Sequence, residues 1–83
     1  MSAFPGFREV AERRHRLIED LVALRRQQGL SQTTVAARMG TSQSVVARLE
    51  SGEIDARLST LERYATALER RLDLRVGPGS GER

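Results

Sequence analysis

Apolar residues recur at helical spacing through the first third of the chain. Between Phe7 and Gln28 there is no glycine or proline, and apolar residues follow at steps of three, four or seven positions (Val10, Leu17, Leu21 and Leu24). Such steps keep side chains on one face of a helix. The pattern predicts either one long helix or two helices with a break near residues 13–16. Gly29 is predicted to end it, because glycine adopts the left-handed conformation at little cost.

Two short helices are predicted next, separated by a glycine turn. Ser31 has the side chain of a good N-cap and precedes a helix over residues 32–39, which Gly40 ends. Ser42 can cap a second helix from residue 43 to about residue 51, which Gly52 ends. Two helices of about eight residues joined by a tight turn are typical of a helix-turn-helix unit.

A further helix is predicted after a loop at residues 53–57. Ser59 and Glu62 have the spacing of a capping box. Apolar residues then continue at helical period (Leu61, Tyr64, Ala65 and Leu68). The predicted fold is therefore a small bundle of four or five helices.

The pattern changes from helical to alternating near the C-terminal end. Leu72, Leu74 and Val76 are separated by charged residues, and this period of two predicts a short strand. Such a strand would pair with a second copy of the chain or with a partner protein. Alternatively, Leu72 and Leu74 complete the last helix and the core. Residues 77–81 are glycine, proline and serine, which predicts a disordered tail.

Composition favours a helical DNA-binding protein over an enzyme. Hydrophobic residues are 39% of the 83 and aromatic residues 4%, which suits one helical domain rather than a β-sandwich. No cysteine is present and His15 is the single histidine, so we expect no metal site, cofactor or disulfide. No catalytic cluster is apparent; Asp20 beside Glu19 is typical of a solvated helix face. No apolar run is long enough for a membrane span or signal peptide, so a cytoplasmic protein is expected.

The basic residues are all arginine. There are 14 of them and the net charge is +3. A guanidinium group suits phosphates and guanine edges. A genome rich in arginine codons would give the same bias, so charge alone does not identify the partner.

The second short helix carries the strongest functional pattern. In a helix-turn-helix unit this helix lies in the major groove, and its exposed side chains reach base edges. Gln43 can pair with adenine and Arg48 with guanine. The alternative is an ordinary helical bundle with a polar surface helix.

Residues 24–68 resemble the XRE family of phage-repressor and Cro-like proteins. The resemblance is carried by five elements in order: GLSQ at residues 29–32, VAARMG at 35–40, TSQS at 41–44, RLESG at 48–52 and LERYATAL at 61–68. It implies an all-α, five-helix lambda-repressor-like domain, usually dimeric, that regulates transcription. We expect an N-terminal helical extension at residues 1–20, the DNA-binding domain at 21–70, and a dimerisation strand and tail at 71–83.

The resemblance also implies roles for individual residues. Gln32 matches the glutamine that holds a phosphate and braces the recognition helix, and Glu50 matches a position with a structural role. The positions implied to read bases are Gln43, Ser44, Ala47 and Arg48, and those implied to hold phosphate are Gln32, Ser42 and Arg57.

Three of these positions have alternative interpretations. Val45 replaces a common serine or threonine, and either meets a thymine methyl or is partly buried. Arg57 is either a backbone contact or a solvated loop charge. Arg48 either reads DNA or forms a surface pair with Glu19 or Glu62. Glu53 and Asp55 put negative charge in a loop expected near phosphate, so they weaken binding or point away.

The flanking segments resemble a narrower group, the HigA-type antitoxins. Two hypotheses for function follow. In the first, a homodimer represses transcription from an inverted-repeat operator on double-stranded DNA. In the second, the chain is an antitoxin of a type II toxin–antitoxin pair that neutralises a ribonuclease toxin by binding it, and represses its own operon.

Overall fold

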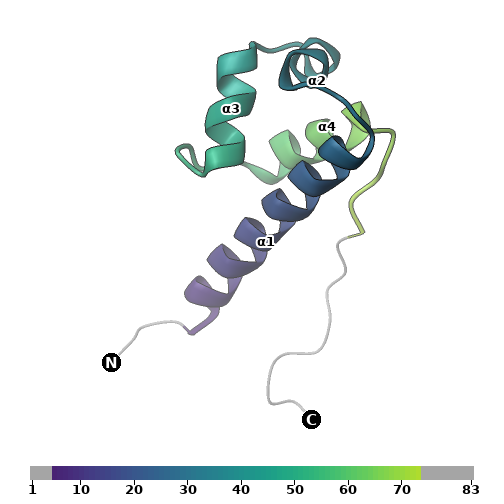
Figure 1. The fold of residues 1–83 in the computed structure, drawn as a ribbon. Coiled ribbons are helices and arrows are strands. Elements are labelled where there is room, and N and C mark those ends of the chain that lie inside the picture. The colour runs from purple at the N-terminus through teal and green to yellow at the C-terminus, as the bar shows by residue number, and fades with distance from the viewer. Residues whose placement is uncertain (1–4, 74–83) are drawn as a thin grey trace.

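Four helices form the described part of the chain. The computed structural model describes the backbone of residues 5–73 and the side chains of residues 11–73. The helices are α1 (Pro5–Gln27), α2 (Gln32–Met39), α3 (Gln43–Ser51) and α4 (Leu58–Ala67) (Figure 1). The prediction of an all-helical helix-turn-helix fold is confirmed. The prediction of five helices is wrong for residues 5–73, which hold four.

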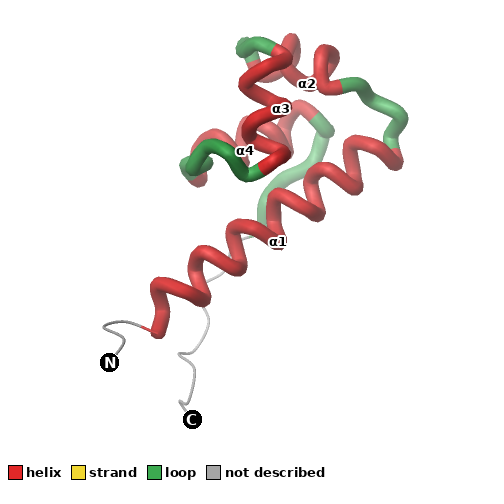
Figure 2. The backbone as a smooth tube through the Cα atoms, turned by 60° about the vertical axis from the view of Figure 1, so that its left-hand side comes forward, coloured by secondary structure: helices red, strands yellow, loops and turns green. Residues whose placement is uncertain are grey.

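Helix α1 is continuous through residues 13–16, so the break allowed by the sequence does not occur. The segment contains no residue that would interrupt the backbone hydrogen bonds there. The first turns of α1 extend beyond the other three helices in both views (Figure 2). Its later turns supply Ile18 and Leu21 to the core.

Helices α2 and α3 begin and end where their serines and glycines predict. Ser31 accepts a hydrogen bond from the Thr34 backbone N–H at 3.0 Å, and Ser42 accepts one from the Val45 N–H at 3.3 Å. Each cap satisfies a backbone donor that the first turn of a helix leaves free. Gly40 ends α2 at φ 74°, where a side chain would be strained. This conformation turns the chain directly into α3.

The N-cap of α4 lies two residues before the predicted cap, Ser59. Arg57 is its N-cap residue and makes no side-chain capping bond. Ser59 lies inside the first turn, so the predicted capping box with Glu62 is wrong. The Arg57 carbonyl instead accepts from the backbone N–H groups of Thr60 and Leu61, at 3.0 and 3.1 Å.

The core consists of apolar side chains from all four helices and the loop before α4. Val35, Val46 and Leu68 are fully buried, and Leu49, Leu61 and Tyr64 are nearly so. Because the apolar faces of α2, α3 and α4 all point into this cluster, the opposite face of α3 is left to solvent. Burial of these side chains is the main source of stability for a domain of this size.

Side chains also join the ends of α2 and α4 reciprocally. Arg38 of α2 donates to the Ala67 carbonyl of α4 at 2.8 Å, and Arg63 of α4 donates to the Met39 carbonyl of α2 at 2.6 Å. Gln28 donates to the Leu68 carbonyl at 3.0 Å. Carbonyls at a helix C-terminus lack partners within the helix and carry partial negative charge. Both arginines therefore stabilise the helix ends as well as the packing of α2 on α4.

The predicted C-terminal strand does not form at residues 71–73, the part of it that the structure describes. Glu69 has φ 60°, and the Arg70 backbone N–H donates to the Ala65 carbonyl at 2.8 Å, which ends α4. Leu72 is half-buried and packs against the core, as the alternative interpretation expected. A strand needs a hydrogen-bonded neighbour, and the remainder of residues 5–73 forms helices and their connections. Leu74 and Val76 lie outside the described residues.

Candidate nucleic-acid interface

The outward face of α3 carries most of the residues for which base contacts were predicted. Gln43, Ser44 and Arg48 are exposed, and Ala47 is half-buried. Positions 43, 44, 47 and 48 lie on one side of a helix because about 3.6 residues make a turn. The apolar positions Val46 and Leu49 face the core. The packing of α3 therefore presents a mainly polar surface with one arginine.

The side chain of Arg48 makes no hydrogen bond or ion pair with any residue in the described part of the chain. The alternative in which it pairs with Glu19 or Glu62 is therefore absent from this structure. Glu19 instead lies 3.1 Å from His15 on α1. The five N–H donors of the Arg48 guanidinium group are free to meet a base edge or a phosphate.

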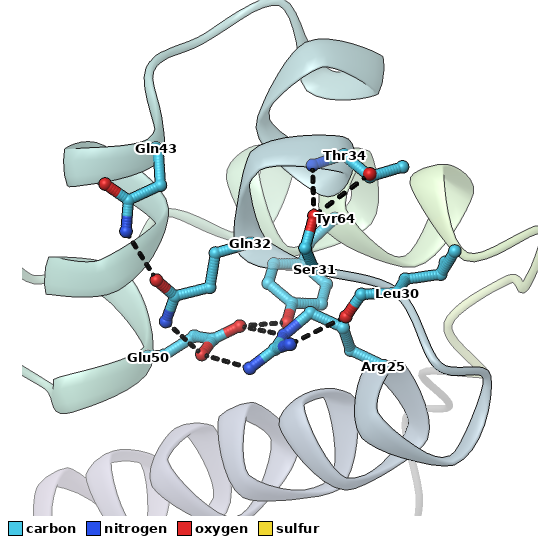
Figure 3. A network of polar contacts seen from close by, with 8 residues as sticks. All are labelled: Arg25, Leu30, Ser31, Gln32, Thr34, Gln43, Glu50 and Tyr64. Atoms are coloured by element: carbon cyan, nitrogen blue, oxygen red, sulfur yellow. Dashed lines mark hydrogen bonds and ion pairs between the residues drawn. The ribbon is translucent and has the colours of Figure 1, made fainter.

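Gln32 connects the two ends of α3. Its side-chain amide donates to Glu50 at 2.8 Å, and its side-chain oxygen accepts from the Gln43 amide at 2.6 Å (Figure 3). Gln43 is the first residue of α3 and Glu50 lies in its last turn. Gln32, the first residue of α2, thus ties both the first and the last turn of α3 to the start of α2.

Glu50 is the centre of a nearly solvent-free polar cluster. Its Oε2 accepts from Arg25 Nε at 2.7 Å and from the Tyr64 hydroxyl at 2.5 Å. Its Oε1 accepts from Arg25 Nη2 at 3.0 Å and from Gln32. The side chains of Arg25 and Glu50 are 9% and 7% exposed. The prediction that Glu50 bonds within the domain agrees with these contacts.

The cluster fixes the ionisation of its members. Burial alone would raise the pKa of Glu50, but hydrogen bonds from Arg25, Tyr64 and Gln32 outweigh it and lower the pKa below 4.5. Burial and the hydrogen bond to Glu50 raise the pKa of Tyr64 well above 10. Glu50 is therefore a carboxylate and Tyr64 a neutral phenol near pH 7.

Arg25 and Tyr64 were not predicted as part of the site. Arg25 follows Ile18 and Leu21 on the inward face of α1 and also donates to the Leu30 carbonyl at 2.8 Å. The sequence did contain one indication of this, because Arg25 occupies a position at helical spacing from the apolar residues Ile18 and Leu21. Its partner is 25 positions away, so the pairing depends on how α1 packs against α3. Tyr64, the single tyrosine of the chain, fits the rule that a buried hydroxyl finds a partner.

The two serines at the start of α3 share one hydrogen bond. Ser42 Oγ and Ser44 Oγ lie 3.1 Å apart, and both residues are exposed. Since one hydroxyl hydrogen joins the pair, the second remains available to a phosphate or a base. Val45 and Ala47 are half-buried, and neither belongs to the apolar cluster of the core as described.

The loop before α4 contains charges of both signs. Arg57 is exposed. Asp55 lies 3.6 Å from Arg14 of α1, and Glu53 accepts from the Ser51 hydroxyl at 3.3 Å. The positive charge of Arg14 reduces the repulsion that Asp55 would exert on a phosphate, whereas the Ser51 hydroxyl is neutral and leaves the charge of Glu53 in place.

The described residues offer few other kinds of site. No group of three or more histidine, aspartate or glutamate side chains within residues 11–73 is placed to hold a metal ion. None of α1 to α4 combines the length and the apolar character needed to cross a membrane.

Comparison with known proteins gives two kinds of match. A family model described as helix-turn-helix matches residues 21–74. The antitoxin HigA1 proteins of Mycobacterium tuberculosis strains CDC 1551 / Oshkosh and ATCC 25618 / H37Rv are each 49% identical over 72 residues, or 87% of this chain and 48% of the relative. The chain thus spans about half the length of the curated relatives it matches. No solved structure matches significantly.

Proposed function

Because the chain belongs to the XRE-type helix-turn-helix family, we propose that it binds double-stranded DNA sequence-specifically through α3 and represses transcription. The observation that carries the proposal is the outward face of α3, where Arg48 has no partner among the described residues and Gln43 is braced at the first turn. Family membership agrees with the prediction that the domain is not an enzyme. A regulator of transcription acts where the DNA is, so we place this protein in the cytoplasm in this proposal.

Gln43 and Arg48 read base edges in this proposal, with Ser44 and Ala47 beside them. Gln43 is suited to adenine and Arg48 to guanine. Val45 contacts a thymine methyl. Because it lies outside the core cluster, its methyl groups are not needed for packing there.

Gln32, Ser42 and Arg57 hold phosphates in this proposal. The Gln32 amide uses one of its two N–H donors on Glu50, so the other can reach a phosphate. The backbone N–H groups at the start of α2 favour an anion at the same place. A homodimer would place two α3 helices in major grooves about one helical turn apart, so the operator is an inverted repeat.

Selection of bound sequences from random duplex DNA, with the molecular mass measured in solution, tests this proposal. One inverted repeat recovered by a dimer supports it. Arg48→Ala should then lose about 1–3 kcal/mol on the selected site and much less on random DNA. A folded protein that recovers no preferred sequence would refute the proposal. Equal losses on both kinds of DNA would make Arg48 a phosphate contact.

A second candidate function is that of an antitoxin, and it is favoured by the 49% identity to antitoxin HigA1. In this proposal the chain also binds a ribonuclease toxin and represses its own operon. In this proposal the first turns of α1, which extend beyond the other helices, form the surface offered to the toxin.

Co-expression with the products of the neighbouring reading frames tests the second candidate. A toxin whose growth arrest is relieved by this chain, and which co-purifies with it, supports the proposal. The control is Arg48→Ala, which should weaken binding to the selected DNA site and keep toxin binding. Neighbouring products that neither arrest growth nor bind the chain would refute it.

A further inference from the structure

Hydrogen bonds connect the buried carboxylate of Glu50 to the exposed amide of Gln43. The path runs from Glu50 to Gln32 at 2.8 Å and from Gln32 to Gln43 at 2.6 Å (Figure 3). An amide side chain has one oxygen that accepts and one NH2 group that donates. The orientation of the two amides therefore decides whether Gln43 directs its oxygen or its second N–H hydrogen toward solvent.

Glu50 permits one order. An ionised carboxylate only accepts hydrogen bonds, and both of its oxygens already receive bonds from Arg25. Gln32 must therefore direct its NH2 group toward Glu50 and its oxygen toward Gln43. Gln43 must in turn direct NH2 toward Gln32, which leaves its oxygen and one N–H hydrogen for an outside partner. One acceptor beside one donor matches the N6 amino group and N7 of adenine.

We infer that Glu50 acts through Gln32 as a positioning residue for base specificity, by fixing the amide of Gln43 in the orientation that selects adenine. The inference rests on the proposed DNA-binding function and deepens it. With the amide of Gln43 reversed, both N–H hydrogens would face outward and would suit the O6 and N7 acceptors of guanine. Glu50 therefore disfavours guanine without touching DNA.

The test uses the full chain and duplexes that differ only at the base pair whose preference is lost in Gln43→Ala. Wild type should favour adenine over guanine there. Glu50→Gln can face Gln32 with either end of its amide, so the adenine-to-guanine affinity ratio should fall at least about fivefold. This is the discrimination that the loss of one hydrogen bond of ordinary strength removes. Tyr64→Phe is the matched control: it alters the same cluster, keeps the Glu50–Gln32 bond, and should leave the ratio within twofold.

A swapped double variant separates positioning from stability. In Glu50→Gln with Gln32→Glu, the carboxylate stands beside Gln43 and again accepts from it. The adenine-to-guanine ratio should return to within twofold of wild type, although the new charge weakens overall affinity. If Glu50→Gln proves unfolded by circular dichroism, Gln32→Met carries the test, because it removes the connection at a surface position. The same fall in the ratio is expected for Gln32→Met.

Three results would overturn the inference. The first is an adenine-to-guanine ratio within twofold of wild type in Glu50→Gln or, if that is unfolded, in Gln32→Met. The second is guanine as the base that depends on Gln43. In both cases sequence-specific binding through Gln43 survives. The third is a base preference unchanged in Gln43→Ala at every position, which would refute the proposed reading role of Gln43 together with the inference.

Discussion

Replacing Glu50 with glutamine removes the negative charge from the cluster that joins α1, α3 and α4 and keeps the shape of the side chain. The carboxylate accepts four hydrogen bonds, two from Arg25 and one each from Tyr64 and Gln32. In Glu50→Gln one oxygen becomes an NH2 group that faces two donors. Tyr64 or Gln32 can reorient to suit the new amide. The guanidinium group of Arg25 can only donate, so it loses one hydrogen bond in either orientation of that amide.

The expected loss of unfolding free energy is about 3–5 kcal/mol, as for a buried ion pair broken by removal of one partner. The side chains of Arg25 and Glu50 are 9% and 7% exposed, so water cannot replace the lost interaction fully. A domain of 83 residues has a total stability of about 4–12 kcal/mol. The variant should therefore be severely destabilised, and partly unfolded at 37 °C.

Urea unfolding followed by circular dichroism at pH 7 measures the effect. Glu62→Gln is the matched control, because Glu62 is exposed on α4 and has no polar partner among the described residues. Its stability should stay within about 0.5 kcal/mol of wild type. A loss below about 1 kcal/mol in Glu50→Gln would refute the reasoning, and would mean that water solvates the cluster despite its burial.

Three further predictions follow from the same structure. The pKa of Glu50 is lowered in the folded protein, so the contribution of its charge to the unfolding free energy is complete above the usual pKa of 4.5 and is lost as the pH falls through the folded value. Acid unfolding should therefore begin at a lower pH in wild type than in Glu50→Gln. The pKa of Tyr64 is raised, so stability should also fall as the pH rises above about 10, and Tyr64→Phe, itself less stable by about 1.5–3 kcal/mol, should lose less of its stability there. Glu69→Gly should stabilise the domain by about 0.5–1 kcal/mol, because φ 60° suits glycine, whereas Glu62→Gly inside α4 should cost about 1 kcal/mol; equal effects of the two in urea unfolding would contradict the argument.

The elements that the sequence predicts well are those set by neighbouring residues. Ser31 and Ser42 cap their helices from within one turn, and Gly40 and Gly52 adopt left-handed conformations that other residues avoid. The start and end of α4 were missed because neither is local. Arg57 has no capping side chain, and the chain turns at Glu69, a residue that rarely adopts positive φ.

The candidate site divides in the same way. The resemblance implied that Gln32 braces the recognition helix and that Glu50 has a structural role, and the structure shows the contacts that each makes. Arg25 was not foreseen because burial of an arginine is tolerated only with a partner, and its partner is supplied by a different helix. Roles on DNA remain predictions for Gln43, Arg48 and the phosphate contacts.

Five arginines of the described residues make side-chain contacts within the protein, and three of them join its helices. Arg25 is held by Glu50, while Arg38 and Arg63 donate to the helix-end carbonyls of Ala67 and Met39. The carboxylate of Glu50 neutralises the buried guanidinium group of Arg25, which therefore displaces no counterions from a duplex. The dependence of DNA affinity on salt concentration should therefore reflect the exposed arginines that face the duplex, such as Arg48 and Arg57 in the proposed interface, rather than the arginine content of the sequence.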